Sequence, residues 1–147
     1  MGTALAEELF CKGLDALDHD HLYLARVCFE QSVEEDRTPL NCSYLAFSLA
    51  VTKGEFTQAL ALAEEAVARD PGNPVHYLNL GRVQIMSGAK DKGIATLRSG
   101  MRLGADTSIQ SELEKLGIRK PPVFTTLPRE HALNKYLGLF FTRIGLR

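Results

Sequence analysis

The sequence lacks the features that would send a protein into or across a membrane. No apolar run approaches the roughly 20 residues of a membrane-spanning helix. The first ten residues, MGTALAEELF, contain no basic stretch followed by an apolar one, and Ala6 stands where N-terminal myristoylation needs a hydroxyl. The three cysteines, Cys11, Cys28 and Cys42, are odd in number and unrelated in spacing, which is typical of reduced, buried thiols. We therefore expect a cytoplasmic protein.

Catalytic and metal-binding motifs are missing as well. The sequence contains no glycine-rich phosphate loop and no HExxH, CxxC or GxSxG pattern. Its densest group of potential ligands is the run Asp18-His19-Asp20-His21. Four consecutive residues at a turn cannot all converge on one tetrahedral ion. We therefore expect no enzymatic activity, no cofactor and no bound metal.

Charge is divided unevenly along the chain, although the net charge is only −1. Residues 1–73 contain 13 Asp/Glu and 5 Lys/Arg, net −8, and residues 74–147 contain 5 Asp/Glu and 12 Lys/Arg, net +7. This asymmetry favours head-to-tail contact between copies, or an acidic partner at the second half. The basic half has no stripe of interleaved aromatic residues, so we do not expect nucleic-acid binding.

A period of 34 in residue number runs through most of the sequence. The middle unit has small residues at Ala59, Ala63 and Ala66. The corresponding positions one period earlier are Ala25, Phe29 and Ser32. One period later they are Gly93, Leu97 and Gly100. Three units follow one another without insertion, at residues 6–39, 40–73 and 74–107.

Each unit has the pattern of two short helices, with apolar residues at i, i+3 and i+4. Gly54 separates the two helices of the middle unit. Breaks that carry proline, such as Thr38-Pro39 and Asp70-Pro71, separate consecutive units, because proline cannot sit inside a continuing helix. The units are therefore predicted to be helical hairpins.

These hairpins resemble the tetratricopeptide repeat family. The resemblance rests on the period of 34, on the order Tyr77-x-x-Leu80-Gly81, and on the Asp70-Pro71 pair that ends the preceding unit. It covers residues 6–107 and implies an all-α fold, a right-handed α-α superhelix of three helical hairpins. The sequence departs from the family pattern at Arg37 (usually proline), Phe47 (usually glycine) and Gly93 (usually alanine).

A different pattern follows the third unit. The segment SIQSELEKLG places Ile109, Leu113 and Leu116 on one helical face and ends at Gly117. The last hairpin of a solenoid exposes an apolar face, so we expect a capping helix at about residues 107–116. Repeats and cap together would form one domain, residues 1–117.

Residues 118–147 are predicted to be a spacer with two prolines followed by a helix from about Pro128. The apolar side chains of this C-terminal helix are Leu133, Leu137, Phe140, Phe141 and Ile144. Leaving each of them in water forfeits roughly 1.5–3 kcal/mol, so we expect them to pack on the repeats, on a second copy or on a partner. A membrane surface suits them less, because few basic residues follow one face.

In the family, the first helix of each hairpin lines the concave face. The resemblance therefore implies a protein-binding groove whose walls hold Phe10, Leu14, Asn41, Tyr44, Ser48, Val51, Val75, Leu78, Asn79, Arg82, Ile85 and Met86. For individual members, Ile85 above all, the alternative is a place in the core.

Relatives that bind the acidic C-termini of heat-shock chaperones use a clamp of Lys, Asn and Arg. The corresponding positions here are Phe10, Leu14, Leu45, Val75 and Asn79, and only Asn79 fits. Without cations at these positions, the groove cannot offset the desolvation of a carboxylate, so we do not expect that class of partner.

The sequence thus predicts a non-catalytic scaffold or adaptor that binds a peptide or helix of a protein partner in an apolar groove, with possible self-association through the C-terminal helix. The alternative is a small chaperone of the same family that shields an apolar segment of a client.

Overall fold

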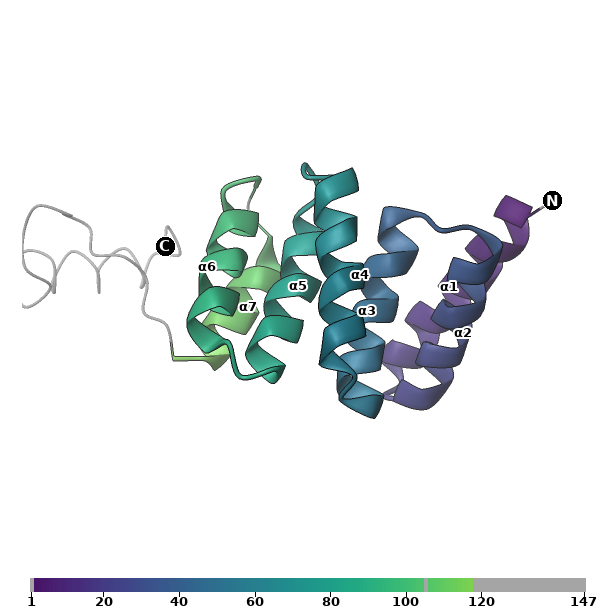
Figure 1. The fold of residues 1–147 in the computed structure, drawn as a ribbon, viewed down its shortest axis with the longest axis horizontal. Helices are drawn as coiled ribbons and strands as arrows, with labels where there is room; N and C mark the ends of the chain where they lie inside the picture. Colours follow the sequence, from purple (N-terminus) through teal and green to yellow (C-terminus); the bar gives the residue numbers. More distant parts are fainter. Residues whose placement is uncertain (1, 105, 118–147) are drawn as a thin grey trace, which may run out of the picture. The chain divides into compact units, whose positions relative to one another are not determined.

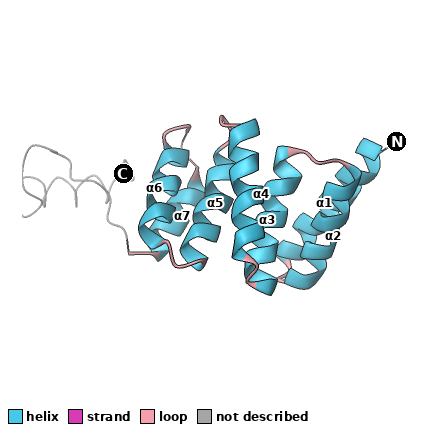
Figure 2. Ribbon diagram, in the orientation of Figure 1, coloured by secondary structure: helices cyan, strands magenta, loops and turns pink. Residues whose placement is uncertain are grey.

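The computed structural model describes residues 2–104 and 106–117, and over that part of the chain it contains α-helices and no strand (Figures 1 and 2). The helices are α1 (Gly2–Asp18), α2 (Leu22–Glu35), α3 (Pro39–Lys53), α4 (Phe56–Arg69), α5 (Pro74–Met86), α6 (Lys90–Met101) and α7 (Thr107–Lys115). The all-α fold is confirmed. The chain divides into two compact units, Met1–Leu113 and Glu114–Arg147, and the helix expected from about Pro128 lies outside the described residues.

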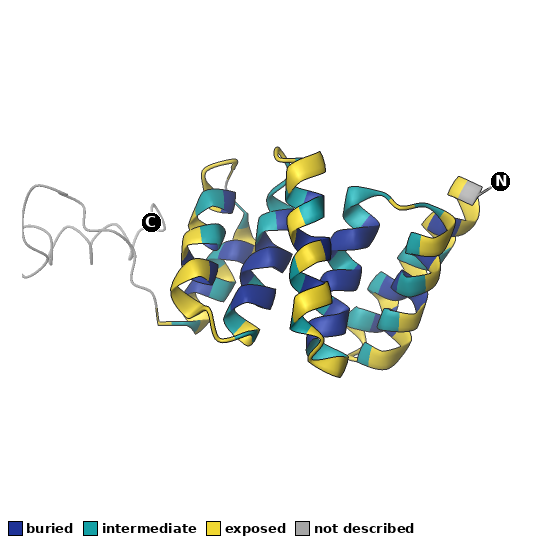
Figure 3. Ribbon diagram, in the orientation of Figure 1, coloured by how far each residue is buried: buried dark blue, intermediate teal, exposed yellow. Residues whose placement is uncertain are grey.

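Consecutive helices pair as hairpins, α1 with α2, α3 with α4, and α5 with α6. Neighbouring hairpins are joined because α2 packs against α3, α4 packs against α5, and α3 packs against α5. The hairpins therefore follow one another in chain order as a superhelix (Figure 1). Buried residues are most frequent along α3 and α5, which have neighbours on several sides (Figure 3).

The breaks between hairpins carry ordinary helix-start signals. Thr38 caps α3 by accepting a hydrogen bond from the amide three residues further on (3.1 Å), and Pro39 occupies the first helical turn. Asn73 caps α5 by accepting from the amide two residues further on (3.1 Å), again followed by proline, Pro74. These side chains satisfy amides that have no partner inside the helix, and proline has no amide to satisfy.

Helices α5 and α6 approach most closely at Gly81 and Gly93. A Cβ added to Gly81 would stand 2.7 Å from Leu97 Cγ and 3.2 Å from the Gly93 oxygen. A Cβ added to Gly93 would stand 2.5 Å from Ile85 Cγ1 and 2.8 Å from the Gly81 oxygen. Gly93 is therefore required where the family usually has alanine, because the side chain of Ile85 fills the space that a methyl group would need.

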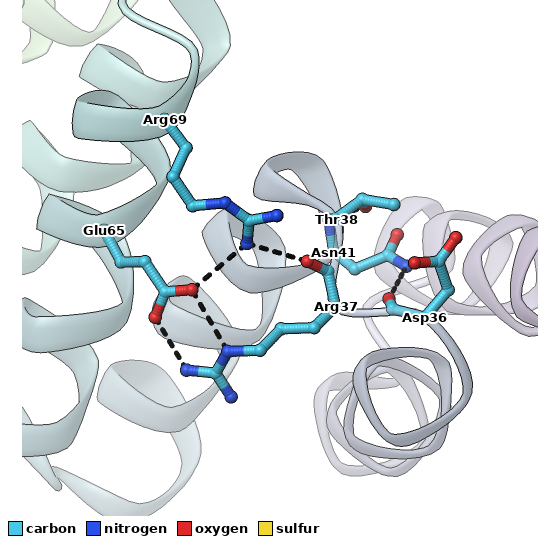
Figure 4. A network of polar contacts seen from close by, with 6 residues as sticks. All are labelled: Asp36, Arg37, Thr38, Asn41, Glu65 and Arg69. Carbon is cyan, nitrogen blue, oxygen red and sulfur yellow. Dashed lines mark hydrogen bonds and ion pairs between the residues drawn. The ribbon is translucent and has the colours of Figure 1, made fainter.

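An ion-pair network joins the first two hairpins where the family usually has proline (Figure 4). Arg37 donates two hydrogen bonds to Glu65 of α4, Nε to Oε1 at 3.0 Å and Nη2 to Oε2 at 2.6 Å. Arg69 Nη1 donates to the Arg37 carbonyl (2.7 Å) and to Glu65 Oε1 (3.1 Å). These contacts hold the pKa of Glu65 below its usual range, chiefly through the hydrogen bonds from Arg37. A bidentate pair thus fixes a junction that lacks the usual rigid residue.

Candidate protein-binding surface

The first helices of the hairpins lie side by side, beginning with α1 and α3. The rings of Phe10 and Tyr44 meet nearly at right angles, with centroids 5.2 Å apart. Both rings also contact Phe29 of α2, at 5.6 Å and 5.4 Å respectively. Phe29 is fully buried, and edge-to-face contacts of this kind add to the free energy of burying the rings. This aromatic cluster fixes the spacing of α1 and α3.

Arg82 of α5 connects its helix to α3 and to α7. Its guanidinium lies over the Phe47 ring, 5.1 Å from the centroid. Its Nη2 donates to Glu112 Oε1 of α7 at 2.7 Å, and the two side chains are only 27% and 18% exposed. One side chain therefore links three helices through a cation–π contact and an ion pair. Its positive charge is already matched by a carboxylate of the same fold.

Four of the twelve residues predicted to line a groove are buried in the folded chain: Asn41, Ser48, Leu78 and Asn79. Asn41 donates its side-chain amide to the Asp36 carbonyl at 2.8 Å, which closes the turn before α3. Asn79 donates to Ser43 Oγ at 3.0 Å. These four are buried because inner helices are covered by neighbouring hairpins as well as by their own partner helix.

The remaining eight residues keep some exposure, to different degrees. Phe10, Leu14 and Tyr44 pack partly against the core, and burial raises the pKa of the Tyr44 hydroxyl. Ile85 lies over Gly93 of α6, so it takes the alternative place towards the core. We define the odd-helix face as the partly exposed side chains of α1, α3 and α5 that remain from the prediction: Phe10, Leu14, Tyr44, Val51, Val75, Arg82 and Met86.

Phe47 and Glu112 contact Arg82 of this face but were not predicted for it. The sequence distinguishes Phe47 only as a departure from glycine. Glu112 follows Leu78 by one period of the repeat, so the register that relates Phe10, Tyr44 and Leu78 reaches it. Extending the period into the capping helix would have placed this carboxylate beside the first helix of the third hairpin.

Titratable side chains elsewhere do not gather into a chemical centre. In the described part of the chain, no three His, Cys, Asp or Glu side chains come together as they would around a metal ion. His19 Nδ1 donates to the Asp15 carbonyl at 2.8 Å and its ring stacks on His21 with centroids 6.2 Å apart, both on the exposed turn. His76 is fully buried and its Nε2 lies 3.1 Å from Asp70 Oδ2, while its Nδ1 has no hydrogen-bond partner.

Burial governs the charge state of His76. It lowers the pKa of the imidazole, and the hydrogen bond and charge of Asp70 act in the opposite direction. A protonated ring would place a second N–H at Nδ1, where the described residues offer no acceptor. His76 therefore behaves as a neutral structural residue between the second and third hairpins.

Among the helices that the structure describes, none combines the length and the apolar character that crossing a bilayer requires.

The geometry defines a class of protein, an α-α solenoid built from helical hairpins that repeat with a period of 34, followed by α7, the last helix of the described residues. Residues 50–115 match the model of the tetratricopeptide repeat family. Over these residues the resemblance to the tetratricopeptide repeat family that the period predicts is confirmed. No curated protein matches it in sequence.

Solved structures with this fold are tetratricopeptide repeat domains. The Arabidopsis OM64 TPR domain has a TM-score of 0.66 and 16% identity, covering 79% of this chain and 97% of that one. The first TPR of Spaghetti (RPAP3), bound to the HSP90 peptide SRMEEVD, has a TM-score of 0.64 and 18% identity, covering 78% and 92%. The Sgt2 TPR domain from Aspergillus fumigatus has a TM-score of 0.61 and 15% identity, covering 88% and 93%. At these identities the similarity establishes the fold.

Proposed function

We propose that this protein is a non-catalytic interaction module that holds a peptide or helix of a partner protein against the odd-helix face. The observation that carries the proposal is the layer formed by α1, α3, α5 and α7, joined by the Phe10–Tyr44 contact and by the Arg82 bridge. Similar folds support it, because RPAP3 and Sti1 domains have been solved with HSP90 or HSP70 peptides.

The chemistry of the face favours an apolar segment without a free carboxylate. Its exposed members are mostly aliphatic or aromatic, and Met86, at the end of α5, is 37% exposed. Methionine adapts its shape to different apolar surfaces. The cation of the face, Arg82, is held by Glu112, so a partner's carboxylate would have to displace an existing ion pair.

We place the protein in the cytoplasm. The support is that Cys11, Cys28 and Cys42 are unpaired, and that burial raises the pKa of the Cys42 thiol, which keeps it protonated.

The proposal is tested by selecting binding peptides from a displayed peptide library on the full chain. Met86→Glu should weaken the selected peptide at least about tenfold, equivalent to about 1.4 kcal/mol, because it places a charge in an apolar contact. Ala61→Glu is the matched control, since Ala61 is exposed on α4 outside the face. Equal affinity for both variants would remove the odd-helix face from the proposal.

A further inference from the structure

The outer side of α2 carries an apolar patch that the proposed function does not use. Tyr23, Leu24 and Val27 are 68%, 55% and 40% exposed. Tyr23 and Val27 are four residues apart and Leu24 and Val27 are three apart, so the side chains share one face of the helix. We call these three residues the α2 patch. The core contacts of α2 come from its other side, where Ala25 and Phe29 are fully buried.

The repeat itself does not require this patch. The positions one period further on, in α4, are Thr57, Gln58 and Ala61, and the next set, in α6, is Asp91, Lys92 and Ala95. All six are exposed and all are polar or small. Three large exposed apolar side chains at positions that are otherwise polar or small indicate a contact surface.

The patch lies in the most acidic part of the molecule. Residues 1–35 contain 8 Asp/Glu and 2 Lys/Arg, net −6. The two cations, Lys12 and Arg26, each pair with a glutamate of their own helix at 2.7 Å. On α2 itself, Glu34 follows Val27 by seven residues and is exposed on the same side. Two α2 patches facing each other would therefore bring like charges together, which disfavours symmetric pairing through this face.

We propose that the α2 patch binds residues 128–147 of a second copy of this chain. Residues 128–147 contain four Lys/Arg and Glu130 as their single acidic residue, net +3, and carry the apolar residues at helical spacing named above. Both the charge and the apolar character of that segment complement the patch.

The order of the helices favours a second copy over the same chain as the source. The patch belongs to the first hairpin, whereas the segment follows α7, the last helix described. A head-to-tail arrangement of two copies brings the patch and the segment together without running the segment past the intervening hairpins. The contact stands apart from the odd-helix face, so this inference holds or fails independently of the proposed function.

A contact made by three large side chains is at the small end of specific interfaces. We therefore expect weak association that is visible at a protein concentration of about 100 µM and decreases on dilution.

The test is the absolute mass of the full chain in solution, measured by light scattering. The measured mass of the unmodified protein should exceed the monomer mass of 16.2 kDa. The measured mass of the variant Leu24→Lys/Val27→Lys should equal the monomer mass. The matched control is Gln58→Lys/Ala61→Lys, which makes equivalent changes one period later on exposed positions of α4 and should keep the higher mass. Circular dichroism of all three proteins checks that helicity is unchanged.

The result supports the inference only if the α2 variant alone dissociates. A monomeric unmodified protein at about 100 µM overturns it, since the segment would then not bind a second copy in the concentration range expected of a weak interface. Equal masses for the α2 variant and the unmodified protein also overturn it. A third variant, Met86→Glu, separates the two faces: if it dissociates the protein and the α2 variant does not, the segment binds the odd-helix face instead.

Discussion

Asn79 of α5 donates its side-chain amide to the hydroxyl of Ser43 in α3, 3.0 Å away, and both residues are buried. This hydrogen bond joins the second and third hairpins. It also occupies the side-chain amide of Asn79, the residue whose type fits the carboxylate clamp of chaperone-binding relatives. What the sequence presents as a binding residue is, in the fold, a polar contact between repeats.

A peptide that ends in a free carboxylate should therefore bind poorly. The HSP90 peptide SRMEEVD is bound in the RPAP3 structure. We expect isothermal titration calorimetry to detect no binding of this peptide to the present chain with a dissociation constant below about 1 mM. The physical reason is that Arg82 is already paired with Glu112, and burying a carboxylate without a free cation costs more free energy than the contact returns. Micromolar binding that disappears when the C-terminus is amidated would contradict this view of the face.

The junction at Arg37 should behave as a bidentate ion pair. Replacing Arg37 with lysine keeps the charge but cannot reproduce two parallel hydrogen bonds to Glu65. We expect the free energy of unfolding to fall by about 0.5–1 kcal/mol, since the arginine side chain is 56% exposed and water screens the pair. Urea denaturation of Arg37→Lys, Glu65→Gln and the double variant measures the coupling. Strictly additive losses would show that the two residues do not interact in solution.

The close approach of α5 and α6 gives a sharper stability prediction. Gly81→Ala should lower the free energy of unfolding by about 1–3 kcal/mol, because its methyl group would overlap Leu97 and force the helices apart. Gly72→Ala is the control, since a Cβ there meets nothing within 4 Å, and it should change stability by less than about 0.5 kcal/mol. Thermal unfolding followed by circular dichroism distinguishes the two. Equal effects would mean that the helices are less tightly packed than described.

His76 predicts how stability changes with pH. Its folded-state pKa lies below the ordinary value of 6.5, so the unfolded chain binds a proton that the folded chain resists. The contribution of His76 to stability is therefore fully present above about pH 7 and is lost as the pH decreases through about 6.5.

The measurement compares the free energy of unfolding of the unmodified protein and of His76→Gln at about pH 8 and about pH 5.5. The variant should lose less stability between the two values. The subtraction is needed because His19, whose pKa is raised by its hydrogen bond to the Asp15 carbonyl, contributes in the opposite direction. Identical pH dependence in both proteins would contradict the assignment of a neutral, buried imidazole.

The sequence was sufficient to predict the fold but not to predict how deeply each side chain is buried. The period of 34 predicts hairpins because small residues recur at corresponding helical positions, as Ala25, Ala59 and Gly93 show. The same period predicts which side of a helix faces its partner. It does not predict how much of the opposite side is covered by the next hairpin, and for that reason it does not reveal that Leu78 and Ser48 are buried.

Long side chains were the least predictable part of the surface. Arg82 of α5 contacts Phe47 of α3 and Glu112 of α7. Both contacts depend on how these three helices are stacked. Arg37 likewise finds Glu65 at a separation of 28 residues. Such contacts follow from the stacking of hairpins, which a pattern within one hairpin does not contain.

The most direct test of the account is to map a selected peptide onto the chain by backbone-amide chemical shifts. Binding at the odd-helix face predicts that added peptide shifts amides of α1, α3 and α5 near Leu14, Val51 and Met86, and leaves the exposed side of α4 near Ala61 unchanged. Shifts confined to α4 and α6, or spread evenly over the chain, would contradict binding at the odd-helix face.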